Sequence, residues 1–146
     1  MGFRFKFATL LNVRKIQENM AQQAFSQAQR HLSTLKMLKE QVLAKRKLLQ
    51  VELMSRMRQG SNSREVKLYY DYLHHLEGSI ERIDENIKAA ERQVELKREE
   101  LLKAKRASKA IMRLKEIHQV RFDEAERKQE MKFLDEIAIL KAGGER

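Results

Sequence analysis

Residues 66–94 read VKLYYDYLHHLEGSIERIDENIKAAERQV, and apolar side chains recur in this stretch at alternating steps of three and four. The nine positions of this series are Val66, Tyr69, Leu73, Leu76, Ile80, Ile83, Ile87, Ala90 and Val94. A heptad repeat of this kind is typical of a helix that lies against another helix, because the step averages 3.5 residues and keeps one stripe on one face. The stretch therefore predicts a long helix with a continuous contact stripe.

The composition fits long helices and excludes several other classes of protein. The chain of 146 residues contains no proline, which would interrupt a helix, and only 6% aromatic against 36% charged residues. This balance is typical of a coiled coil. The absence of cysteine excludes disulfides and thiolate metal sites. No stretch approaches the roughly 18 continuous apolar residues of a membrane span, and the N-terminus lacks a secretory signal.

The net charge of +10 is unevenly distributed along the chain. Residues 1–58 contain 12 Lys/Arg and 3 Asp/Glu, a net charge of +9, whereas residues 59–146 contain 19 and 18, a net charge of +1. A basic helix is suited to an acidic protein surface, to nucleic acid or to anionic lipid.

A turn divides the chain into two predicted helices. Residues 58–64 read RQGSNSR, a cluster of turn-forming residues centred on Ser61. We expect helices over residues 8–57 and 65–141, with Thr9 or Asn12 as the first N-cap and glycines after the second helix. Residues 1–146 are thus predicted to form a single hairpin domain. Residues 1–7 alternate in polarity and are predicted to be a frayed start.

The apolar positions of the first helix are less regular than those of the second. We expect its contact face to comprise Leu10, Val13, Met20, Ala24, Ala28, Leu32, Leu35, Leu38, Val42, Leu49 and Leu53. The small residues Ala21, Ala24 and Ala28 would let the helices approach closely.

The unequal lengths predict an overhang. At 1.5 Å per residue the helices would be roughly 75 and 115 Å long, so the second would continue without a partner after about residue 115. The predicted fold is all-α: an antiparallel two-helix coiled-coil hairpin with an overhanging C-terminal helix. The contact stripe weakens after Val94 and loses its phase after Ile111.

Apolar residues return near the C-terminus, as Met131, Phe133, Leu134, Ile137, Ala138 and Leu140. Two interpretations of this amphipathic patch remain open. It binds a partner, or it folds back on the phenylalanine-rich N-terminus or dimerises.

The sequence offers no basis for catalysis, a metal site or a cofactor. His31 and His118 are isolated, and the adjacent His74 and His75 point roughly 100° apart on a helix. The basic run between Lys97 and Lys115 lacks interleaved aromatic residues, so a protein partner is favoured over nucleic acid. A second stripe of Leu68, Tyr72, His75 and Ser79 flanks the first and is a candidate contact surface.

Three motifs resemble those of a known family, the flagellar FliJ proteins. The first is the opening Phe3-x-Phe5-x-Phe7-x-x-Leu10-Leu11-x-x-Arg14. The second is Tyr69-x-x-Tyr72-Leu73-x-x-Leu76-x-x-x-Ile80, and the third is Glu130-x-Lys132-x-x-Asp135-Glu136-x-Ala138. The length, the absence of cysteine and the order of a shorter and a longer helix agree as well, so the resemblance covers essentially the whole chain.

This resemblance implies a non-enzymatic component of the flagellar type III protein export apparatus, needed for flagellum assembly and motility. It implies a fold similar to the gamma-subunit stalk of rotary ATP synthases. The implied partners are the hexameric export ATPase FliI, the export gate FlhA and substrate chaperones, with no small-molecule substrate and no nucleic acid. The implied location is the bacterial cytoplasm, peripheral to the membrane through protein partners.

Carried onto this sequence, the resemblance implies two contact sets. The export-gate contact comprises Leu38, Val42, Tyr72, Leu76 and Ser79. The ATPase-ring contact comprises Phe3, Phe5, Phe7, Leu10, Leu11, Arg14, Met131, Phe133, Leu134, Ile137 and Leu140. Two alternatives are a generic coiled-coil scaffold or dimerisation module and a basic nucleic-acid-binding coiled coil.

Overall fold

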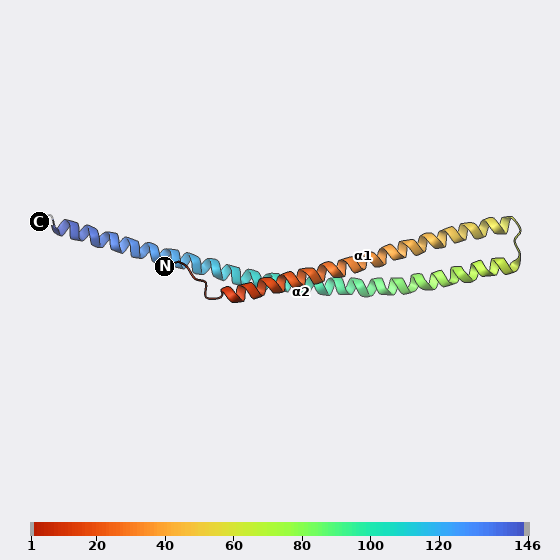
Figure 1. The fold of residues 1–146 in the computed structure, drawn as a ribbon, viewed down its shortest axis with the longest axis horizontal. Helices are drawn as coiled ribbons and strands as arrows, with labels where there is room; N and C mark the ends of the chain where they lie inside the picture. Colours follow the sequence, from red (N-terminus) through yellow and green to blue (C-terminus); the bar gives the residue numbers. More distant parts are fainter. Residues whose placement is uncertain (1, 145–146) are drawn as a thin grey trace. The chain divides into compact units, whose positions relative to one another are not determined.

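The computed structural model describes residues 2–144 and contains two long helices (Figure 1). Helix α1 comprises Ala8–Arg58 and helix α2 comprises Ser63–Gly144, so the predicted bounds of 8–57 and 65–141 differ from the observed ones by at most three residues. The helices are antiparallel and packed on one another, as the sequence predicted for an all-α hairpin.

The chain divides into two compact units. The hairpin unit is Ala21–Leu101, and the terminal unit combines Met1–Met20 with Leu102–Arg146. Each unit contains a part of α1 and a part of α2. The organisation of residues 1–146 as a single domain stays a prediction.

The turn of the hairpin unit is closed by backbone hydrogen bonds at the end of α1. The Ser61 N–H donates to the Arg56 carbonyl and the Gly60 N–H donates to the Met57 carbonyl, over 3.2 and 3.3 Å. Gly60 has a φ of +81°, the left-handed conformation that glycine adopts without a Cβ clash. These features form a Schellman motif, which satisfies carbonyls that the helix end would leave unpaired.

An asparagine cap fixes the start of α2. The Asn62 side-chain oxygen accepts a hydrogen bond of 2.8 Å from the Glu65 N–H. This bond satisfies one of the free N–H groups of the first helical turn. The cap explains why α2 begins at Ser63, two residues before the predicted start.

The predicted contact stripe of α2 forms the core of the hairpin unit. All nine positions from Val66 to Val94 are buried or half-buried, and Leu73, Leu76, Ile80, Ile83 and Ala90 are the most enclosed. The stripe continues with the same spacing through Lys97 to Leu101. The prediction drawn from this stretch is therefore confirmed.

The contact stripe of α1 is different from the predicted one. Leu10, Val13, Met20 and Leu38 are exposed, although they were expected to face α2. The observed stripe follows alternating steps of three and four without a break, and each of its positions is buried or half-buried. It comprises Leu11, Arg14, Glu18, Ala21, Phe25, Ala28, Leu32, Leu35, Lys39, Val42, Arg46, Leu49 and Leu53. Four of these thirteen positions carry charged side chains. A contact stripe tolerates long charged side chains, because their aliphatic stems pack against the other helix while the charged groups reach solvent.

The pairing register of the hairpin unit agrees with a reflection about Ser61. The residue numbers of the contacting pair Glu52 and Tyr69 add to 121. Those of Lys39 and Asp84 add to 123. Because the turn fixes this register, the α1 positions that face α2 are set by geometry and include polar residues.

In the terminal unit α1 begins at Ala8, without a side-chain cap. The Phe7 carbonyl accepts the N–H of Leu11 over 2.9 Å, so Thr9 and Asn12, the predicted N-caps, lie inside the helix. The contact stripe of α2 was expected to lose its phase after Ile111. The regular alternation does break there, because the next position due, Lys115, is exposed, but half-buried positions continue at Leu114, His118 and Phe122. Every residue from Asp123 to Gly144 is exposed.

Neither helix is, in the part of the chain that the structure describes, long and apolar enough to cross a membrane.

Candidate partner-binding surfaces

Four side chains tie the two helices together at the turn. The Tyr69 hydroxyl donates a hydrogen bond of 3.0 Å to the Glu52 carboxylate. Arg56 pairs with Glu65, approaches Glu52 at 3.8 Å and lies 5.9 Å from the centre of the Tyr69 ring. Burial between the helices raises the pKa of the Tyr69 hydroxyl, and the hydrogen bond to Glu52 raises this pKa further. This cluster holds the end of the hairpin in one arrangement.

An apolar surface lies beside this cluster. Leu49, Leu68, Tyr69 and Tyr72 line a shallow depression, in which Leu68 is 65% and Tyr72 is 38% exposed. The Lys45 ammonium lies 5.7 Å from the centre of the Tyr72 ring, so a residue of α1 orients an exposed aromatic side chain of α2. Exposed aromatic and aliphatic side chains with a fixed orientation are suited to protein contacts.

The residues predicted to contact an export gate are divided between surface and core. Leu38 and Tyr72 are exposed, and Val42 and Ser79 are half-buried. Leu76 is only 5% exposed and forms part of the core, so a partner cannot reach it in the folded hairpin. Lys45 was absent from the predicted set, because no periodicity links a lysine of α1 to a tyrosine of α2.

The N-terminal phenylalanines pack on α2 within the terminal unit. The Phe3 ring packs at a tilt on Phe122, with 5.5 Å between ring centres, and the rings of Phe5 and Phe7 lie 5.6 and 6.4 Å from that of His118. Arg4 and Lys6, which alternate with them, are exposed. The prediction of a frayed start was therefore wrong: these residues form a strap, which we call the phenylalanine clasp (Phe3, Phe5, Phe7, His118 and Phe122).

The clasp changes the interpretation of several predicted contact residues. The three phenylalanines are half-buried, so a partner reaches only part of each side chain. Leu10 is exposed, Arg14 is half-buried and Leu11 is buried. The sequence signal for the clasp is present: His118 lies seven residues after Ile111, and Phe122 lies four residues further.

The C-terminal apolar face is fully accessible. Its predicted members Met131, Phe133, Leu134, Ile137 and Leu140 are all exposed, and so is Ile139. The phenylalanines at the N-terminus contact His118 and Phe122 rather than this face, so the interpretation that it folds back on them is wrong. We call the five predicted residues Met131, Phe133, Leu134, Ile137 and Leu140 the C-terminal face.

The fold and these surfaces define a class of protein: two long paired helices with exposed apolar side chains along them. Among residues 2–144 no group of three or more histidine, cysteine, aspartate or glutamate side chains could hold a metal. The sequence adds the family. Residues 3–146 match the model of the flagellar FliJ protein, and the chain belongs to this family. No curated protein and no solved structure matches the chain. The family is a non-catalytic component of the flagellar export apparatus.

Proposed function

We propose that this chain couples the hexameric export ATPase FliI to the export gate FlhA and escorts substrate chaperones during flagellum assembly, which motility requires. The family match over residues 3–146 supports this proposal most strongly. The exposure of the whole C-terminal face supports it as well, because an apolar helix face of this size needs a partner. In this proposal the α2 segment after Phe122 overhangs the hairpin as the stalk of a rotary ATP synthase does.

The C-terminal face is the proposed contact with the ATPase ring. The direct test adds the purified protein to the export ATPase and measures hexamer assembly and ATP hydrolysis. We expect both to increase, and the variant Leu134→Asp with Ile137→Asp to lose the increase. A matched control is Leu48→Asp with Val51→Asp, because these apolar side chains are also exposed but belong to the hairpin unit. The proposal fails if the unaltered protein changes neither assembly nor hydrolysis.

The surface around Tyr72 is the proposed contact with the export gate. Leu76 is not a useful position for this test, because truncating this buried side chain would leave a cavity in the core and destabilise the hairpin. We expect Leu38→Ala with Tyr72→Ala to weaken binding to the gate by about tenfold or more. Tyr70→Ala is the control, since Tyr70 is an exposed tyrosine two residues from Tyr72. Equal affinities of all three proteins would contradict this part of the proposal.

A second candidate is a coiled-coil dimerisation module, which the uncovered C-terminal face favours. Sedimentation equilibrium separates the two candidates. A dimer at micromolar concentration that becomes a monomer with Leu134→Asp and Ile137→Asp would favour dimerisation. A monomer for the unaltered chain would favour the adaptor. The proposed location is the cytoplasmic side of the bacterial membrane, reached through protein partners.

A further inference from the structure

The positive charge of the chain is concentrated in one part of the terminal unit. Residues 1–20 and 102–122 together contain 11 Lys/Arg and 2 Asp/Glu, a net charge of +9. Residues 21–101 contain 15 and 12, and residues 123–146 contain 5 and 7. Counting the charge of residues 1–58 against that of residues 59–146 assigned the positive charge to the first helix. In the terminal unit, however, most of the positive charge comes from residues 102–122 of α2.

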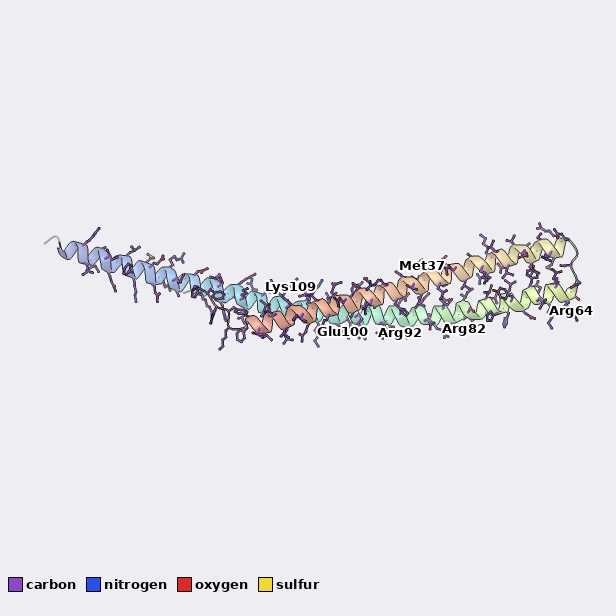
Figure 2. All side chains as sticks on the ribbon, viewed as in Figure 1. Met37, Arg64, Arg82, Arg92, Glu100 and Lys109 are labelled. Carbon is purple, nitrogen blue, oxygen red and sulfur yellow. The ribbon has the colours of Figure 1, made fainter. Side chains whose placement is uncertain are left out.

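Within residues 102–122 an exposed stripe combines basic and apolar side chains. We call it the outer basic stripe: Leu102, Arg106, Lys109, Arg113, Ile117 and Val120. Steps of three and four residues place these side chains on one face of α2, and all six are exposed. Lys109 is labelled on this part of α2 in Figure 2. The stripe contains no acidic residue.

The basic side chains of the stripe are available to an external anion. In the described residues 2–144 the ion pairs involve Lys39, Arg56 and Lys97, none of which belongs to the stripe. Glu116 is the one acidic residue between positions 102 and 122. Glu116 and Glu124 line one depression together with Arg113, Ile117 and Val120, so carboxylates partly compensate the charge at this end of the stripe. No ion pair of the described residues involves Arg106, Lys109 or Arg113.

We infer that the outer basic stripe binds the surface of a lipid bilayer that contains anionic headgroups. Arg106, Lys109 and Arg113 complement a layer of negative phosphates, because they lie on one face and lack acidic partners. Leu102, Ile117 and Val120 are 45%, 40% and 56% exposed, and they can enter the boundary between headgroups and acyl chains. Nucleic acid fits less well, because the stripe has no aromatic side chain for base stacking and exposes aliphatic groups that phosphates do not need.

This inference is independent of the proposed contacts with an ATPase ring and a gate. It assigns to the chain a direct lipid contact, in addition to any attachment through protein partners. If the stripe does not bind lipid, the expected stimulation of the export ATPase is unaffected, because the assay of hexamer assembly and ATP hydrolysis contains no lipid.

The test is the flotation of the full chain with vesicles of phosphatidylcholine alone or with added phosphatidylglycerol. We expect binding only to the vesicles that contain phosphatidylglycerol, and weaker binding as the salt concentration rises. The variant with Arg106→Gln, Lys109→Gln and Arg113→Gln should bind these vesicles roughly a hundredfold more weakly.

A matched control removes the same charge from another part of α2. Arg82, Lys88 and Arg92 are exposed residues of the hairpin unit, and Figure 2 labels Arg82 and Arg92 on α2. Their replacement by glutamine should change binding by less than about threefold if the stripe, rather than total charge, recognises the lipid. Equal losses in the two variants would overturn the inference. An unchanged far-ultraviolet circular dichroism spectrum verifies that each variant is folded.

Three further outcomes would overturn the inference. The first is equal binding to vesicles with and without phosphatidylglycerol. The second is no binding to anionic vesicles at low salt. The third is tighter binding to a short DNA duplex than to the vesicles, lost in the same triple variant, which would assign the stripe to nucleic acid. Weaker binding of the variant Ile117→Ser with Val120→Ser to anionic vesicles would support insertion of the apolar side chains.

Discussion

The hairpin unit and the terminal unit pack parts of the same two helices with different side chains. In the hairpin unit the α2 stripe is apolar from Val66 to Val94, and leucines of α1 such as Leu49 and Leu53 occupy facing positions. In the terminal unit the facing positions include Arg14, Glu18 and the buried Ser108, and aromatic rings at the chain start supply much of the contact. Apolar burial between the helices therefore stabilises the hairpin unit more strongly than the terminal unit.

The largest effect is expected from the core of the hairpin unit. Leu76→Ala should lower the free energy of unfolding by about 2–4 kcal/mol, because it removes a buried side chain and leaves a cavity. Urea denaturation followed by circular dichroism measures this change. Leu96→Ala, at an exposed position of the same helix, should change it by less than about 0.5 kcal/mol. Similar losses in the two variants would remove the distinction between core and surface.

A change of the opposite sign is expected in the terminal unit. Arg14→Leu replaces a half-buried charged side chain on the α1 contact stripe and should stabilise this unit by about 1 kcal/mol. Slower hydrogen exchange of the amides in residues 8–20 measures the gain. Lys15→Leu, at the exposed neighbouring position, should leave the exchange rates unchanged. Faster exchange in the Arg14 variant would show that the charge supports the packing.

A smaller effect is expected from the ion pair within the hairpin unit. The Lys39 ammonium lies 2.6 Å from the Asp84 carboxylate, and both side chains are partly exposed. A double-mutant cycle with Lys39→Met and Asp84→Asn should give a coupling energy of about 0.5 kcal/mol. This coupling should decrease in 1 M salt, because screening weakens exposed pairs. A coupling that is larger and independent of salt would show that charge contributes to this unit as strongly as apolar burial.

The smallest effect is confined to alkaline pH. Because the folded state raises the pKa of the Tyr69 hydroxyl, its contribution to stability is complete below the unfolded pKa of about 10 and is lost as the pH rises through the folded pKa. Between pH 9 and 11 the unaltered chain should lose more stability than Tyr69→Phe. Urea denaturation at the two pH values measures the difference, and Tyr70→Phe should behave like the unaltered chain.

The sequence predicted the helices and the α2 stripe well because local patterns specify both. Steps of three and four over 29 residues are typical of a helix that packs on another helix, and the turn residues Gln59 to Asn62 separate the two helices. The C-terminal face was also recognised, since its apolar residues stand out in a polar segment. The contact stripe of α1 was misassigned, because apolar residues such as Leu10 and Met20 were given precedence over polar ones.

The sequence by itself determined that this chain forms two long antiparallel helices, because heptad spacing, turn chemistry and the absence of proline all act over a few residues. Only the tertiary structure decided which face of α1 meets α2, since the register set at the turn places Lys39 and Arg46 on the contact stripe. The packing of the chain also decided that Phe3 to Phe7 lie against His118 and Phe122, and that Arg106, Lys109 and Arg113 are exposed. These contacts join residues far apart in the chain. The heptad spacing placed His118 and Phe122 on the contact stripe of α2, but periodicity within one helix does not indicate which residues of the N-terminus meet them.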